Sequence, residues 1–173
     1  MISKKIEVVL VDKNDRVVGF REKYAAHHHP VPLHRAVSVL IIDKAGLKML
    51  LQRRAGSKPT WPLYWSNASC THPLKDESYL AAAERRLKEE MGIETKLKKL
   101  FSFVYEAKYD EIWGEHELDH VFAGRYEGKI VADPGEAADY KWMDVEKLKQ
   151  EIKESPETFT PWFRMILGEY LRK

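Results

Sequence analysis

The chain of 173 residues contains one cysteine, Cys70, and lacks any long apolar run. A single cysteine cannot form an internal disulfide, and such scarcity is typical of proteins that stay in the reducing cytoplasm. No stretch approaches the ~18 consecutive apolar residues that a transmembrane helix needs. The first ten residues carry two lysines but reach Glu7 before the apolar segment of a secretory signal could form. These absences predict a cytoplasmic protein with no membrane partner.

An excess of charge of one sign is also missing. The 29 Lys and Arg residues nearly balance the 27 Asp and Glu residues, and the net charge of +2 argues against a nucleic-acid partner. No internal repeat, low-complexity tract or Gly/Ser linker divides the sequence. Its length suits one domain, so we expect a single domain over residues 1–173. An enzyme or a small-molecule binder is the class that these observations leave.

Hydrophobic patterning predicts short strands and a few helices. The expected strands cover residues 6–11, 17–20, 36–43, 47–51, 101–107, 116–126 and 140–143. Turn residues join the first two strands, and residues 44–46 join the next two, so both pairs are expected to form hairpins. Hairpins mixed with helices predict an α+β or mixed α/β fold rather than repeated βαβ units.

Helices are expected over residues 76–91, over residues 145–153 and from Pro161 onward. The first carries its apolar residues at three- and four-residue steps and ends at Gly92; these apolar residues are Leu80, Ala83, Leu87 and Met91. Thr160 is expected to cap the last helix. Between strand and helix, residues 53–75 form a connection long enough to suggest a functional loop.

The seven histidines fall in three places along the chain, and two carboxylates flank one of them. The three groups are His27, His28, His29 and His34, then His72, then His116 and His120. Glu115 and Glu117 are two residues apart, so on a strand both point to one face. Imidazoles and carboxylates from separate loops could surround one divalent ion. A solvated histidine-rich loop and an exposed acidic strand face are the alternative interpretation of the same spacing.

Cys70 lies two residues before His72, and three interpretations of it stay open. A nearby metal or cation would make it a reactive thiolate, because either lowers the pKa of a thiol. A lone cytoplasmic cysteine is more often a small buried apolar residue. A Cys–His nucleophilic pair is disfavoured, because adjacent spacing does not make the two side chains converge.

A charged motif follows from Thr71 to Ile93. Five residues separate Thr71 from Glu77, seven separate Glu77 from Arg85, and the chain continues Arg85-Arg86-Leu87-Lys88-Glu89-Glu90-Met91-Gly92-Ile93. This spacing resembles the signature helix of the Nudix family, whose members cluster carboxylates there to bind magnesium against a diphosphate. Thr71 stands where the family has glycine, and Arg86 where it has glutamate. Arg86 and Glu90 share a helix face, so a cation that can contact phosphate replaces one metal-binding charge.

Within that superfamily the chain resembles the type I isopentenyl-diphosphate isomerases over nearly its whole length. The segments that carry the resemblance are 22–27 (EKYAAH), 33–34 (LH), 53–54 with Lys58, 61–62 (WP), 65–67 (WSN), 70–73 (CTHP), 103–105 (FVY), 113–117 (WGEHE) and 160–162 (TPW). The resemblance implies an α/β/α sandwich with a mixed sheet. It also implies conversion of isopentenyl diphosphate to dimethylallyl diphosphate. A Nudix hydrolase that cleaves a diphosphate and a noncatalytic Nudix-like binding module are the rival interpretations.

The resemblance also implies roles for particular residues. Cys70 and Glu117 would act as the acid–base pair on opposite sides of the substrate, with Tyr105 as proton donor or relay. The implied metal ligands are His27, His34, His72, Glu115 and Glu117, for one Mn²⁺, Zn²⁺ or Mg²⁺, and Glu90, for a Mg²⁺ that bridges to the diphosphate. The implied substrate-binding residues are Lys23, Arg54, Lys58 and Arg86 around the diphosphate and Trp162 over the hydrocarbon tail.

Further expectations concern the surroundings of this site. Trp61 and Trp65 are expected to wall the same pocket. The remaining histidines, His28, His29, His116 and His120, match no ligand position and are expected at the surface or behind the ligands. The expected partner is a small isoprenoid diphosphate, bound by a monomer that needs no flavin.

Overall fold

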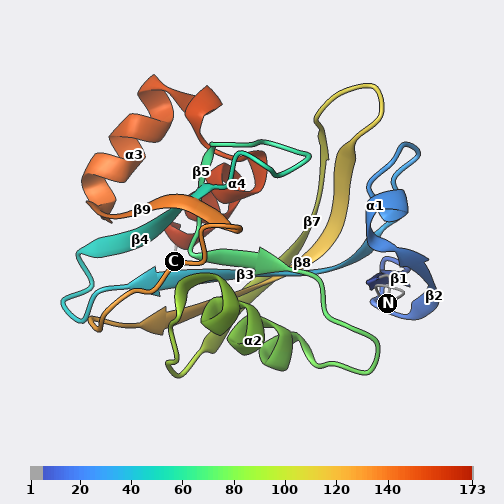
Figure 1. Cartoon of the computed structure of the whole chain (residues 1–173), viewed down its shortest axis with the longest axis horizontal. Coiled ribbons are helices and arrows are strands. Elements are labelled where there is room, and N and C mark those ends of the chain that lie inside the picture. The colour runs from blue at the N-terminus through green and yellow to red at the C-terminus, as the bar shows by residue number, and fades with distance from the viewer. Residues whose placement is uncertain (1–5, 173) are drawn as a thin grey trace.

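The computed structural model describes residues 6–172, which form nine strands and four α-helices around one mixed sheet. The N-terminal hairpin of β1 (Glu7–Val11) and β2 (Val17–Glu22) lies at one end of the molecule (Figure 1). The sheet continues from β1 through β3 (His34–Ile42) to β4 (Lys48–Arg54) and β5 (Trp65–Ser66). Both hairpins predicted from turn residues are confirmed.

The centre of the sheet is β3, because four other strands pair along it: β1, β4, β6 (Ser69–Thr71) and β8 (Gly114–Arg125). Short β6 pairs with it antiparallel, while β8 runs parallel to it from His34 to Ile42. Outside β8 lies antiparallel β7 (Lys98–Lys108), and β9 (Ala137–Asp144) pairs with β4. The parallel pairing of β3 with β8 makes the sheet mixed. It also brings residues about 80 positions apart into register.

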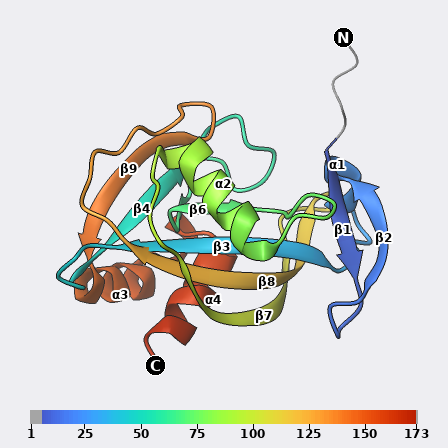
Figure 2. The ribbon, with the colours of Figure 1, turned by 90° about the horizontal axis from the view of Figure 1, so that it is seen from below.

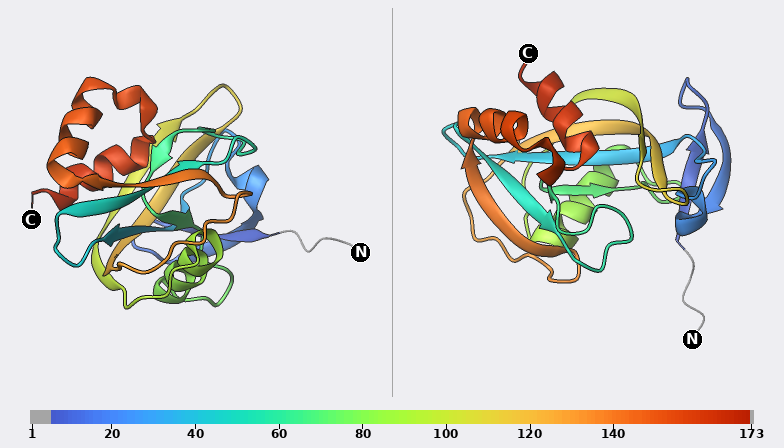
Figure 3. Two further views of the ribbon diagram at one scale, coloured as in Figure 1. Left: turned by 60° about the vertical axis from the view of Figure 1, so that its left-hand side comes forward. Right: turned by 90° about the horizontal axis from the view of Figure 1, so that it is seen from above.

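Helices cover both faces of this sheet. Helix α2 (Tyr79–Met91) crosses one face, and α3 (Val145–Glu154) and α4 (Pro161–Tyr170) lie on the other side (Figures 2 and 3). Each face of the sheet packs against a hydrophobic core, and alternate residues of β3 point into one core or the other. Leu40 and Ile42 pack in the core beneath α4, whereas Val39 and Ile41 pack in the core beneath α2. The expected α/β/α sandwich is therefore confirmed.

The boundaries differ from the predictions where local signals compete. Helix α2 begins at Tyr79 rather than at residue 76, because Ser78 caps it and its side chain accepts from the Ala81 amide. Leu80 is 40% exposed, and Ala82 takes the buried position predicted for it. A short helix that the sequence did not predict, α1 (Lys23–Ala26), directly precedes His27.

Other helix predictions hold with smaller changes. The strand and helix expected near residues 140–153 are β9 and α3, and α4 starts at Pro161 as predicted. Thr160 stands at the N-cap of α4, but its hydroxyl lies 3.0 Å from that of Ser66 and does not cap the helix. A membrane-spanning helix, one both long and apolar enough, is not found between residues 6 and 172.

Candidate active site

One face of the sheet gathers the polar side chains that the sequence singled out. On β8, the alternation of strand residues places Glu115, Glu117 and Asp119 on the same face as buried Val121, which packs in the core beneath α4. Residues directly across a ladder share a face. The pairing of His34 and Tyr105 with Glu117 therefore brings both side chains to that face. Cys70 pairs with Ser38, which lies four residues after His34 on β3, so the thiol lies on the same face of the sheet.

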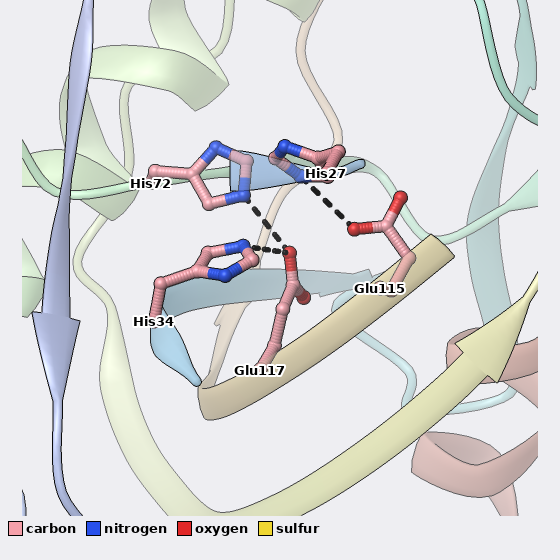
Figure 4. A group of neighbouring side chains, drawn as sticks. All are labelled: His27, His34, His72, Glu115 and Glu117. Carbon is pink, nitrogen blue, oxygen red and sulfur yellow. Dashed lines mark hydrogen bonds and ion pairs between the residues drawn. The ribbon is translucent and has the colours of Figure 1, made fainter. Parts of the chain in front are cut away.

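Three imidazoles and two carboxylates converge at this place, and they are the residues that the family resemblance implied (Figure 4). One ligand atom from each of the five residues can be chosen so that all lie within 4.8 Å of one another; these residues are His27, His34, His72, Glu115 and Glu117. Nε2 of His72 lies 2.9 Å, and Nε2 of His34 3.6 Å, from Oε1 of Glu117. Nε2 of His27 lies 3.0 Å from Oε2 of Glu115. His27 directly follows α1, His34 begins β3, His72 directly follows β6, and Glu115 and Glu117 lie on β8.

Backbone contacts orient two of these imidazoles for metal binding. Nδ1 of His27 lies 2.6 Å from the Lys23 carbonyl, and Nδ1 of His34 lies 2.9 Å from the Pro32 carbonyl. When each Nδ1 donates its proton there, the Nε2 lone pair is left to face the centre of the group. Within residues 6–172, Nε2 of His34 is buried without a hydrogen-bond partner. An orphaned buried nitrogen beside two carboxylates fits a divalent ion bound by nitrogen and oxygen.

The charges in this group are strongly coupled. Although burial would lower the pKa of His27, the adjacent Glu115 carboxylate raises it to about 9. Burial lowers the pKa of His72 to about 3, so this ring is neutral, as a metal ligand must be. For Glu117, burial is outweighed by the imidazoles of His34 and His72, which hold its pKa well below the usual range.

Glu117 has a further partner in Tyr105. The Tyr105 hydroxyl donates to Oε2 of Glu117 at 2.6 Å. Burial, together with the Glu117 charge, raises the pKa of Tyr105 well above its ordinary value, so the phenol keeps its proton. Oε1 of Glu117 therefore faces the imidazoles of His34 and His72, while Oε2 accepts a hydrogen bond from Tyr105.

Cys70 lies among polar side chains and lines a cavity together with Tyr105 and Glu117. Its Sγ donates to Oδ1 of Asn67 at 3.3 Å and lies 3.5 Å from the Ser38 hydroxyl. Burial, and secondly the charge of Asp119, raises the pKa of the thiol to about 12. The protonated thiol is therefore the favoured form in the metal-free protein. The thiolate interpretation, which depends on a nearby metal or cation, stays a prediction. A neutral thiol in this position can deliver a proton.

Four cations predicted to bind diphosphate line the cavity; they are Lys23, Arg54, Lys58 and Arg86. The Arg54 guanidinium is held by donation to the Thr60 and Trp61 carbonyls. Glu90 is buried beside Arg86, which donates to its Oε1 at 3.0 Å, while Gln52 donates to Oε2 at 2.8 Å. Arg86 and Glu90 thus share a helix face, as the spacing predicted.

The aromatic wall differs partly from the prediction. Trp162 lines the cavity as expected, but Trp61 and Trp65 do not belong to its lining. Trp61 is buried and meets the Trp162 ring edge-on at 5.3 Å between centroids. Trp113, on the turn before β8, lines the cavity in their place. Neighbouring residues of a loop can point in opposite directions. The sequence spacing of Trp61 and Trp65 therefore does not determine whether their side chains reach the cavity.

The sequence did not indicate two polar residues near Cys70, namely Ser38 and Asp119. Asp119 is buried, and its Oδ2 accepts from the Ser38 hydroxyl at 2.7 Å. Continuing the alternation of Glu115 and Glu117 by two residues would have placed Asp119 on this face. The other four histidines stay outside the ligand group, as expected. His120, for example, stacks on Tyr79 at 3.6 Å on the opposite face of the sheet.

Comparison with known proteins gives consistent results. Residues 32–163 match the NUDIX domain family. The chain is 45% identical over 165 residues to "Isopentenyl-diphosphate Delta-isomerase 2" of Aromatoleum aromaticum, covering 95% of this chain and 86% of that protein. It is 42% identical to "Isopentenyl-diphosphate Delta-isomerase" of Serratia proteamaculans, with 94% and 89% covered.

Solved structures resemble the fold at lower identity. The crystal structure of DR0079 from Deinococcus radiodurans matches with a TM-score of 0.78 at 18% identity, covering 94% of this chain and 98% of that one. A MutT protein from Methanosarcina mazei matches with a TM-score of 0.68 at 23% identity, covering 82% and 94%. These structural matches support the sandwich architecture alone.

Proposed function

The chain belongs to the isopentenyl-diphosphate Delta-isomerase family of the Nudix superfamily, and we propose how its residues perform that reaction. The enzyme converts isopentenyl diphosphate to dimethylallyl diphosphate. The conversion adds a proton to the terminal alkene carbon and removes another from the allylic carbon, through an intermediate resembling a tertiary carbocation. One site must therefore hold an acid and a base and exclude water.

The observation that carries the proposal is the meeting of Cys70, Tyr105 and Glu117 in one cavity. Cys70, protonated because it is buried, stands as one proton-transfer group. Glu117 is the other, with Tyr105 able to pass a proton to or from its Oε2. Cys70 and Glu117 come from different strands beside β3 and line one cavity, and the alkene would lie between them. The carbon skeleton thus exchanges protons without breaking the diphosphate.

A divalent ion, Mn²⁺, Zn²⁺ or Mg²⁺, would be held by the three imidazoles and two carboxylates of His27, His34, His72, Glu115 and Glu117. When bound, it supplies positive charge that favours the ionised form of Glu117. Nudix enzymes use divalent metals, and this donor set suits all three ions. Glu90 would help to hold a Mg²⁺, which would supply positive charge to the diphosphate, since Mg²⁺ commonly binds one or two carboxylates plus substrate phosphate. No flavin enters the proposal.

The diphosphate would lie against Lys23, Arg54, Lys58 and Arg86, whose cationic groups face one cavity. Trp162 would cover the hydrocarbon tail, where its ring stabilises a developing positive charge. The proposed substrate is therefore a small isoprenoid diphosphate. We further propose a monomer that acts in the cytoplasm without a nucleic-acid or membrane partner, as one domain over residues 1–173.

Substitutions test the acid–base assignment directly. We expect Cys70→Ala and Glu117→Gln each to abolish turnover, while circular dichroism and the melting temperature stay near those of the parent. His116→Gln is the matched control, because His116 lies between two ligands on β8 but outside the ligand group. Near-parental kcat in Cys70→Ala would refute the role of the thiol.

Metal analysis tests the ligand assignment. We expect the purified protein to bind one equivalent of Mn²⁺ or Zn²⁺ in the histidine–carboxylate group, and His34→Gln to lose it. A chelator should remove both the ion and the activity, and returning Mn²⁺ should restore turnover. Unchanged metal content in His34→Gln would contradict the assignment.

A further inference from the structure

Glu136 is an acidic residue that the reaction scheme leaves unused, although it contacts two cations of the proposed diphosphate site. It immediately precedes β9, and its backbone is fixed on both sides. Its carbonyl accepts from the Ala55 amide at 2.9 Å, and its own amide donates to the Asp133 carbonyl at 2.9 Å. The Asp133 amide in turn donates to the Glu90 carbonyl at the end of α2. Glu136 therefore stands on a loop anchored to both segments that carry the cations.

A single carboxylate oxygen of Glu136 serves both cations. Oε2 accepts from Nη2 of Arg86 at 2.8 Å and also from Nζ of Lys58. Lys58 lies in the loop after β4 and Arg86 lies in α2, so Glu136 joins two separate elements. The three side chains are between 18% and 23% exposed, which leaves the ion pairs partly shielded from solvent.

We propose that Glu136 is the positioning residue of the diphosphate site, because its shared oxygen holds the Lys58 ammonium and the Arg86 guanidinium at one spacing. The inference rests on the proposed function, in which those two cations bind the diphosphate. Two cations that share an oxygen lie close enough to repel each other strongly. The flexible Lys58 side chain would otherwise move toward solvent and lose its orientation.

The geometry favours positioning over competition with the substrate. Lys58 and Arg86 line the cavity, whereas Glu136 does not. Glu136 therefore contacts the two cations without occupying the cavity that would hold the diphosphate. Burial would raise the pKa of Glu136, but the hydrogen bond from Lys58 and the charges of Lys58 and Arg86 lower it. The carboxylate is thus ionised wherever the substrate is bound near neutral pH.

Steady-state kinetics of two variants test this proposal. We expect Glu136→Gln to raise KM for isopentenyl diphosphate about fivefold and Glu136→Ala about tenfold or more, with kcat changed less than about twofold. The inhibition constant of inorganic pyrophosphate should rise in parallel. Glutamine keeps the shape and one acceptor but loses the charge, so its effect should be the smaller of the two. If Glu136→Ala does not fold, Glu136→Gln alone decides.

Glu89→Gln is the matched control. Glu89 also pairs with Arg86, through Nη1 at 2.9 Å, but its side chain is 47% exposed, so we expect KM to stay unchanged. An unchanged or lowered KM in Glu136→Gln would overturn the proposal, since a lowered KM is what simple removal of a repelling charge gives. Lys58→Met and Arg86→Met distinguish a failure of the Glu136 proposal from a failure of the proposed diphosphate site. If they raise KM while Glu136→Gln does not, only Glu136 is wrong; if they leave KM unchanged, the diphosphate assignment fails and this inference with it.

Discussion

His27 illustrates, at the scale of single residues, how the site balances charge before any metal binds. Its ring is 9% exposed and faces Glu115, which raises its pKa to about 9. A metal ion must displace that proton, so metal uptake releases a proton below this pH. The same shift links the stability of the metal-free protein to pH.

We expect the metal-free protein to lose stability as the pH rises from 6.5 to 9. The pKa of His27 is higher in the folded than in the unfolded state. Its ion pair therefore stabilises the folded state fully below pH 6.5, and this stabilisation is lost as the pH rises to about 9. The shift corresponds to at most about 3 kcal/mol. Urea unfolding at pH 6 and pH 9, with a chelator present, measures it. His27→Gln should lack this change and His116→Gln should keep it; equal pH dependence in all three proteins would contradict the assignment.

Trp162 is placed by two contacts as well as by its helix. Its indole nitrogen donates to the Ser66 hydroxyl at 3.1 Å, and the Arg54 guanidinium lies 5.2 Å from the ring centroid. These contacts fix the ring at the cavity wall, where it would meet the substrate tail.

We expect Trp162→Leu to lower kcat about tenfold, because an indole face stabilises a nearby cation by about 1–2 kcal/mol. Trp162→Phe should lose less. Stopped assays at saturating isopentenyl diphosphate measure the effect. Trp142→Phe is the control, since Trp142 packs against the core beneath α2 rather than in the cavity. A parental kcat in Trp162→Leu would remove the ring from the mechanism.

Helix α2 connects the site to the rest of the molecule at the scale of elements. Gly92 ends the helix with a φ of +66°, in the left-handed region that glycine adopts without strain. A Cβ there would meet the Val131 side chain at 2.9 Å and the Val131 carbonyl at 3.0 Å. Val131 belongs to the same connection that carries Glu136, so this close approach helps to place that residue.

We expect Gly92→Ala to destabilise the protein by about 1–2 kcal/mol, through backbone strain and the clash with Val131. Gly168→Ala should instead stabilise it by about 0.5–1 kcal/mol, because Gly168 lies within α4 and its Cβ would meet nothing within 4 Å. Urea midpoints of the two variants decide. A shift of the same sign in both would show that the left-handed conformation is not what matters.

The sequence predicted these elements well where local signals are strong. The hairpin turns and the glycine stop of α2 lie in short stretches of chain, and both were correct. The three-residue strand β6 was missed, because so short a strand forms only through its pairing with β3. The helix start at Tyr79 was also missed, because Ser78 provides the cap that ends the preceding turn.

At the scale of the whole molecule, the site depends on pairings that no local pattern specifies. His34 meets Glu117 only because β3 and β8 run parallel, and Cys70 reaches Ser38 only through β6. Resemblance to a family supplied the five ligands before the structure brought them together. It gave no role to Trp113 or to Glu136, since each lies in a connection whose path is set by tertiary contacts.

In the proposed reaction, protons move while the diphosphate stays intact. The test is to incubate the protein with isopentenyl diphosphate, Mg²⁺ and Mn²⁺ in D₂O and to follow proton and phosphorus NMR spectra together. We predict deuterium-labelled dimethylallyl diphosphate and unchanged diphosphate signals. Release of monophosphate or pyrophosphate, without deuterium in the carbon skeleton, would contradict the account and indicate a hydrolase.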